Sequence, residues 1–153
     1  MDPRFQEHVE ALPSALDALL RKEPKKVLSL SKRVPVAGVY LLSEGTEHLY
    51  AGRTRDIGKR LRNHIGTWRE AAFAFRLARE ATGNLKPSYR RGKGSREALM
   101  SDPAFAQAFD EAVARIRQMD ARYVEAPDPV RQLLLEVYVA VALNTPYNDF
   151  DTH

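Results

Sequence analysis

The chain has 153 residues, of which 44% are hydrophobic and 29% are charged, and its formal net charge is +4. This length and composition are typical of one globular domain with a substantial core, and they exclude a disordered chain. Because the sequence has no cysteine, it excludes disulfides, thiolate nucleophiles and cysteine-rich zinc sites. Oxygen and nitrogen ligands remain for any metal, and a hard cation such as magnesium fits best.

Neither a membrane span nor a secretion signal is predicted. No charge-free apolar stretch reaches membrane-spanning length, and residues 1–24 lack the basic-then-apolar order of a signal peptide. We therefore expect a cytoplasmic protein with no membrane partner.

The N-terminal residues predict a helix, because apolar side chains recur at helical spacing. Pro13 either kinks this helix or starts a second one. The basic segment 21–32 reads as a connection. We expect residues 1–32 to form a helical segment packed on the core of a domain that covers residues 33–153. The apolar residues of the helix are Phe5, Val9, Leu12, Leu16 and Leu19.

Two short alternating segments around residues 44–46 predict a β-hairpin. If the loop has three residues, Tyr40 faces Tyr50 directly and Gly38 faces Gly52. The two phenols then share one face, whereas a slip of one residue would separate them. The opposite face would contribute four residues to a core: Val39, Leu41, Leu49 and Ala51.

The hairpin is followed by a predicted helix that begins near Ile57, with Asp56 as its N-cap. Arg60 and His64 would lie one turn apart on the same face of this helix.

Further helical patterns follow. One runs from Trp68 to Ala81 and stops at Gly83, before a basic loop at residues 83–95. Another begins at Asp102 and Pro103. A short strand over 121–126 precedes a last helix, which opens at residues 128–129. We expect an α/β (α+β) fold: a small, mostly antiparallel three-stranded sheet flanked by helices, with a helical and basic-loop insertion at about 67–118 before the third strand.

Basic residues gather in two clusters that could contact phosphates. The alternative is a solvated helix face together with a flexible basic loop. The first cluster contains Arg53, Arg55, Lys59, Arg60 and Arg62, and the second contains Lys86, Arg90, Arg91, Lys93 and Arg96.

Glu136 is the only charged residue between Leu133 and Leu143 in the last predicted helix. A carboxylate in an apolar environment without a partner would cost several kcal/mol or take up a proton. A metal ion, a buried arginine or an exposed helix edge would each explain it.

The order of these motifs closely resembles the GIY-YIG nuclease family. The resemblance rests on Gly38-Val39-Tyr40, Tyr50-Ala51-Gly52, the helix with Arg60 and His64, the lone Glu136, and Pro146-Tyr147-Asn148. It covers roughly residues 33–150, interrupted by the region 67–118. Val39 and Ala51 stand where the family has isoleucine, on the predicted core face.

The resemblance implies hydrolysis of DNA phosphodiester bonds with one divalent cation, Mg²⁺ or Mn²⁺, and no organic cofactor. Glu136 would be the metal ligand, and Arg60 would bind the scissile phosphate with an always charged fork. Tyr40 would be the general base, although a phenol needs a nearby cation for that role. Tyr50 would position the phosphate or the nucleophile, His64 would hydrogen-bond Tyr40 or relay its proton, and Asn148 would orient the end of the last helix.

Each residue also has an ordinary structural interpretation: tyrosines fill strands, His64 could lie on a basic surface, and Asn148 could make a turn. A second metal site is not predicted, although His48 is expected on the phenol face of the hairpin, because the other candidates are scattered over the C-terminal tail: Asp149, Asp151 and His153.

We expect a magnesium-dependent DNA endonuclease, with a non-catalytic nucleic-acid-binding module and a structural or protein-interaction domain as alternatives. The basic residues other than Arg60 would contact DNA, and the loop from Lys86 to Arg96 is the expected additional contact. Cutting both strands with a single active site would need two protomers, as in a homodimer, or two encounters.

Overall fold

A computed structural model of the chain describes residues 1–84 and 95–151. Within these ranges the fold is α+β, with seven helices and a four-stranded antiparallel sheet. The chain divides into two compact units, one formed by residues 1–60 and 119–153 and the other by residues 61–118. No helix in the described ranges is long and apolar enough to cross a membrane.

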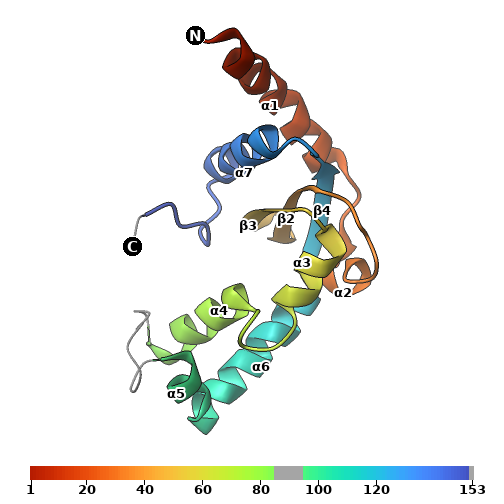
Figure 1. The fold of residues 1–153 in the computed structure, drawn as a ribbon. Coiled ribbons are helices and arrows are strands. Elements are labelled where there is room, and N and C mark those ends of the chain that lie inside the picture. Colours follow the sequence, from red (N-terminus) through yellow and green to blue (C-terminus); the bar gives the residue numbers. More distant parts are fainter. Residues whose placement is uncertain (85–94, 152–153) are drawn as a thin grey trace. The chain divides into compact units, whose positions relative to one another are not determined.

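The first unit contains the sheet, whose strand order is β1-β4-β2-β3. Figure 1 labels β4, β2 and β3. The central hairpin consists of β2 (Gly38–Glu44) and β3 (Glu47–Thr54), and β4 (Asp120–Glu125) pairs with the other side of β2. The predicted count of three strands is wrong, because β1 (Lys25–Lys26) adds a fourth. Two exposed lysines carry no alternating pattern, so only their pairing with β4 reveals this strand.

Two long helices, α1 (Pro3–Arg21) and α7 (Pro129–Leu143), pack on the sheet and on each other (Figure 1). Val39, Leu41 and Ala51 of the hairpin lie in the resulting core, as predicted. Leu49 is also buried, but it is not part of this cluster. The first helix runs through Pro13, so no second helix starts there.

The segment between α1 and β2 is more ordered than the predicted connection, since it contains β1 and the single-turn helix α2 (Val27–Leu30). It also anchors α3 (Ile57–His64), whose first two N–H groups donate to the carbonyls of Val36 and Val34. Asp56 caps this helix as predicted, because its side chain accepts the N–H of Lys59 at 3.0 Å. This anchoring fixes the first turn of α3, which carries Arg60.

The second unit holds three helices among its described residues: α4 (Ala72–Thr82), α5 (Arg96–Met100) and α6 (Pro103–Arg117). The predicted start of α4 at Trp68 is wrong. Residues 67–70 form a turn instead, in which the N–H groups of Glu70 and Ala71 donate to Thr67. The predicted stop at Gly83 and the predicted start at Asp102 and Pro103 are both confirmed.

Candidate active site

The two tyrosines of the hairpin share one face of the sheet, but they are not directly opposite each other. Tyr40 pairs with Gly52 and Tyr50 pairs with Leu42, so the observed register differs by two residues from the predicted one. The turn contains two residues rather than three, and a bulge follows between Leu42 and Ser43. A shift of two residues preserves the face, and the ring centroids lie 6.1 Å apart at an interplanar angle of 39°.

The same bulge changes the place of His48. Its Nδ1 lies 2.8 Å from the hydroxyl of Ser43, and Ser43 alternates with Tyr40 along β2, so His48 lies on the face opposite the phenols. The predicted place of His48 on the phenol face is therefore wrong.

Gly52 leaves open the space that the ring of Tyr40 occupies. A Cβ at this position would collide with the phenol oxygen and ring carbons of Tyr40. The glycine of the second motif is thus required by the tyrosine of the first, a relationship that depends on the register and cannot be read from either motif alone.

Tyr40 is buried, with 1% of its surface exposed, whereas Tyr50 is half-buried. The Tyr40 hydroxyl hydrogen-bonds with both Tyr50 and Arg60. Burial and the neighbouring Tyr50 raise the pKa of Tyr40 well above its ordinary value, while the charge and hydrogen bond of Arg60 act in the opposite direction. At neutral pH Tyr40 is therefore a neutral phenol beside a cation.

Arg60 joins the two phenols. Its side chain is half-buried and hydrogen-bonds with the hydroxyls of both Tyr40 and Tyr50. Burial lowers the pKa of this guanidinium, but the two phenols raise it by more, so the net shift is upward. Arg60 is consequently a fixed positive charge at the phenol pair.

Glu136 lies on α7 and is half-buried. Its carboxylate accepts a hydrogen bond from the backbone N–H of Arg53. Burial raises the pKa of Glu136, and the charges of Arg53 and Arg60 oppose this shift. The carboxylate is therefore not isolated: it lies within electrostatic reach of the same arginine that contacts the phenols.

Gln132 explains how α7 presents Glu136 at this place. It is buried one turn before Glu136, and its amide donates to the carbonyl of Ala126 at 2.9 Å and to the carbonyl of Thr54 at 3.2 Å. Gln132 is not among the site residues predicted from the sequence. The signal was available, since a polar residue four positions before the lone carboxylate lies on the same helix face.

Asn148 fastens the C-terminal segment to the free edge of β3. Its side-chain amide accepts the N–H of Ala51 at 2.8 Å and donates to the carbonyl of the same residue at 2.7 Å. Thr145 donates a third hydrogen bond to the Asn148 oxygen at 2.7 Å. One residue earlier, the N–H of Tyr147 donates to the carbonyl of Leu49.

His64 is the last residue of α3 and belongs to the second unit. It is buried, and its ring packs edge-on against Phe73 with 6.1 Å between the centroids. It is therefore not the surface residue of a basic helix, and its predicted contact with Tyr40 stays a prediction.

The predicted DNA-contacting residues fall into three groups. Arg53, Arg55 and Lys59 are exposed in the first unit, and Arg62 is exposed in the second. Arg96 is half-buried, donates to the carbonyls of Trp68 and Arg69, and lies over the Phe75 ring. The other four lie outside the described residues: Lys86, Arg90, Arg91 and Lys93.

The described residues contain no group of three or more histidines and acids that could hold a metal ion. Glu136 therefore belongs to no such group, and its charged neighbours are Arg53 and Arg60.

Neither the models of protein families, the curated proteins nor the solved structures contain a match to this chain.

Proposed function

We propose that the protein is a metal-dependent endonuclease that hydrolyses DNA phosphodiester bonds with a GIY-YIG-type site. The observation that supports this most directly is the connection of four side chains through Arg60. Its guanidinium hydrogen-bonds with Tyr40 and Tyr50 and lies near the carboxylate of Glu136. Two phenols, a fixed cation and a carboxylate are a suitable set for phosphodiester hydrolysis.

Arg60 binds the scissile phosphate in this proposal. A guanidinium is charged at all relevant pH values and presents paired donors to phosphate oxygens. Because its position is fixed by the two tyrosines and by the anchored first turn of α3, it stabilises the charge that grows on the phosphate during attack.

Glu136 fits a hard cation such as Mg²⁺ or Mn²⁺. It supplies an oxygen donor that is half-exposed, and a single carboxylate leaves most coordination positions to water and phosphate oxygens, as magnesium prefers. When bound, the cation would neutralise the phosphate and stabilise the departing oxygen. The N–H of Arg53 holds the carboxylate in place.

Tyr40 is the proposed general base for the attacking water. Because its pKa is raised, the Tyr40 phenol loses its proton less readily, but the phenolate is a stronger base once it forms. The charge of Arg60 favours the phenolate. Tyr50, the more exposed phenol, contacts the phosphate or the water and hydrogen-bonds back to Tyr40.

Cleavage of supercoiled plasmid, branched DNA and single-stranded DNA, with magnesium and with a chelator, tests this proposal. We expect magnesium-dependent products that disappear in Glu136→Ala and Tyr40→Phe. The matched controls are Glu47→Ala, an exposed acid, and Tyr138→Phe, a half-buried tyrosine of α7. Cleavage that survives both site variants would refute the assignment.

A second candidate, a DNA-binding module that does not cleave, is favoured by the burial of Tyr40, which holds its pKa high. Such a module would bind phosphates through Arg53, Arg55 and Lys59 with strong salt dependence. Salt-dependent filter binding without cleavage of any of the three DNAs would select this function.

A further inference from the structure

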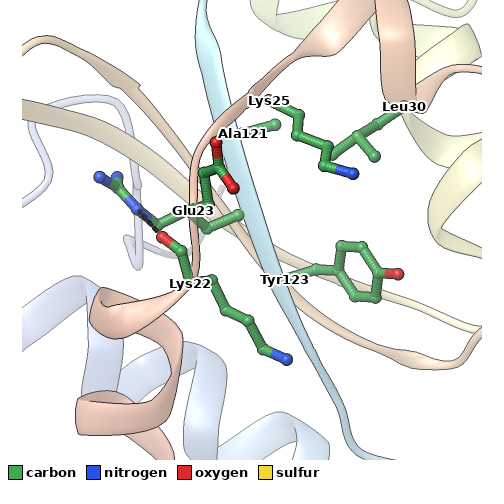
Figure 2. Close-up of a pocket in the computed structure, with 7 residues that line it drawn as sticks. Lys22, Glu23, Lys25, Leu30, Ala121 and Tyr123 are labelled. Atoms are coloured by element: carbon green, nitrogen blue, oxygen red, sulfur yellow. Dashed lines mark hydrogen bonds between the residues drawn. The ribbon is translucent and has the colours of Figure 1, made fainter.

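A small pocket of about 260 Å³ lies at the opposite end of the sheet from β3 (Figure 2). It is formed where the chain leaves α1, pairs as β1 with β4, and continues into α2. The residues that line it are Lys22, Glu23, Lys25, Leu30, Ala121, Arg122 and Tyr123.

The pocket continues the face of the sheet that carries the phenols. Tyr123 is the pairing partner of Tyr40, and Lys25 is the pairing partner of Ala121, two residues before Tyr123 on β4. Paired residues and residues two apart share a face. With strands about 4.8 Å apart, Lys25 lies on the order of 10 Å from Tyr40 along the sheet. At a rise of about 3.4 Å per nucleotide, this separation is about three nucleotides.

The charge of the pocket suits a phosphate. Lys22 and Lys25 are exposed, and within residues 1–84 and 95–151 neither forms an ion pair. The adjacent Lys26, in contrast, pairs with Asp120 at 3.3 Å. Glu23 brings one opposing carboxylate, which the two lysines outnumber.

Arg122 fixes the segment that carries the lysines. Its Nε donates to the carbonyl of Lys22 at 3.0 Å, which ties the residue after α1 to β4. The lysines are thus attached to a braced backbone rather than to a free loop.

The pocket also offers a flat apolar surface. Figure 2 shows the side chains of Lys25 and Leu30 on the same side of β4 as the ring of Tyr123. Tyr123 and Leu30 are half-buried. An aromatic ring beside lysines is the combination with which proteins bind single-stranded nucleic acid, by stacking bases and attracting the backbone.

We infer that this pocket binds an unpaired nucleotide of the DNA strand that is cut, its base on Tyr123 and its phosphate near Lys25 and Lys22. The inference rests on the proposed action on DNA and narrows the substrate to DNA with a single-stranded or branched segment. A base within a duplex is stacked on both faces, so it can stack on Tyr123 only after it has left the duplex stack.

Equilibrium binding without magnesium tests the pocket separately from cleavage. The probe is a short fluorescein-labelled single strand, compared by anisotropy with the same strand annealed to its complement. Tyr123→Leu should weaken single-strand binding about tenfold or more and leave duplex binding unchanged, because base stacking is lost. Tyr123→Phe keeps the ring and should bind as the wild type does.

The charged residues give an independent measurement. Lys25→Gln should weaken binding and reduce the slope of log affinity against log salt by about one, whereas the paired Lys26→Gln should change the slope less. Glu23→Gln should tighten binding, because it removes the opposing charge. All four positions line or adjoin an open pocket, and circular dichroism would verify that each variant is folded.

Equal loss of single-strand and duplex binding in Tyr123→Leu, or equal salt slopes for the two lysine variants, would overturn the inference. If the variants show these binding differences but the wild-type protein cleaves no DNA, the proposed nuclease activity is refuted and the proposed pocket is retained. Cleavage with none of the binding differences would do the reverse.

Discussion

The ring of Tyr40 lies across Gly52, its pairing partner on the neighbouring strand, where any side chain would occupy the space of the phenol. Burial of the ring, its contact with Tyr50 and its hydrogen bond to Arg60 all depend on that space. The two three-residue motifs of the hairpin are therefore one structural unit.

Gly52→Ala should destabilise the protein by about 1–3 kcal/mol, because the added methyl group forces the buried ring to move. DNA cleavage should fall with it. Urea denaturation measures the loss of stability. Gly45→Asn is the control, since Gly45 lies in the left-handed region (φ 60°) with open space around it, a conformation that asparagine tolerates. Equal stability of Gly52→Ala and wild type would contradict the register.

Arg60→Lys should reduce the cleavage rate about 10²–10³-fold while the fold persists, because an ammonium cannot serve the two phenols and a phosphate with the geometry of a guanidinium. Single-turnover kinetics measures the effect. Arg55→Lys makes the same replacement at an exposed neighbour and should cost little. A similar loss in both variants would assign Arg60 to general electrostatic attraction.

Glu136→Gln should stabilise the metal-free protein at neutral pH while abolishing cleavage. Burial raises the pKa of Glu136 in the folded state, which therefore favours the protonated carboxyl. The stability that this protonated form contributes is complete below the unfolded-state pKa and is lost as the pH rises through the folded-state pKa. At pH 7 the folded protein holds an ionised carboxylate that is partly desolvated, and glutamine removes that cost. Thermal unfolding should show a higher Tm for the variant at pH 7 and a smaller difference near pH 4. A Tm that falls at pH 7 would show that the contacts to Arg53 and Arg60 dominate.

The cleavage rate should rise with pH. Tyr40 acts as a base only when it is deprotonated, and burial places its pKa above the ordinary value, so the reactive fraction grows about tenfold per pH unit from about pH 6 to about pH 9. Rates at saturating magnesium should show this slope without a plateau. A flat profile would indicate that a step other than proton removal by Tyr40 limits the rate.

Asn148→Ala should cost about 1–3 kcal/mol, because the N–H and carbonyl of Ala51 and the hydroxyl of Thr145 lose their partner together. Chemical denaturation measures the cost. Asn84→Ala, which removes only local contacts to Thr82 at an exposed position, should change stability less.

Much of the first unit could be predicted from local sequence, because strong periodicity and capping residues specify its elements. The helix starts at Asp56 and Asp128 and the phenol face all follow from patterns within about ten residues. The predicted register is wrong by two residues: the turn is one residue shorter than predicted, and the bulge between Leu42 and Ser43, which has no signature in the alternation, adds the second. The shift of two residues keeps Tyr40 and Tyr50 on one face, whereas between the bulge and the turn the shift is one residue, which places His48 on the other face.

The remaining differences between the predicted and the observed structure involve residues that are distant in sequence. Strand β1 is two exposed lysines, and it exists because β4, almost a hundred residues later, offers them partners. Likewise, Gln132 resembles any polar helix residue until the carbonyls of Thr54 and Ala126 are known. For Gln132 the sequence shows only that it shares a helix face with Glu136, and its hydrogen-bond partners come from elsewhere in the chain.

The C-terminal segment has a consequence for the behaviour of the protein at high concentration. Strand β3 is at the end of the sheet, and a bare strand edge can recruit another chain into intermolecular β-pairing. Here the N–H of Tyr147 donates to the carbonyl of Leu49, and the Asn148 amide hydrogen-bonds with both the N–H and the carbonyl of Ala51. The carboxylate of Glu136 accepts the N–H of Arg53. The groups that are proposed to organise cleavage also cap the edge against aggregation, so mutants that disarm the site at Asn148 should be the ones that precipitate.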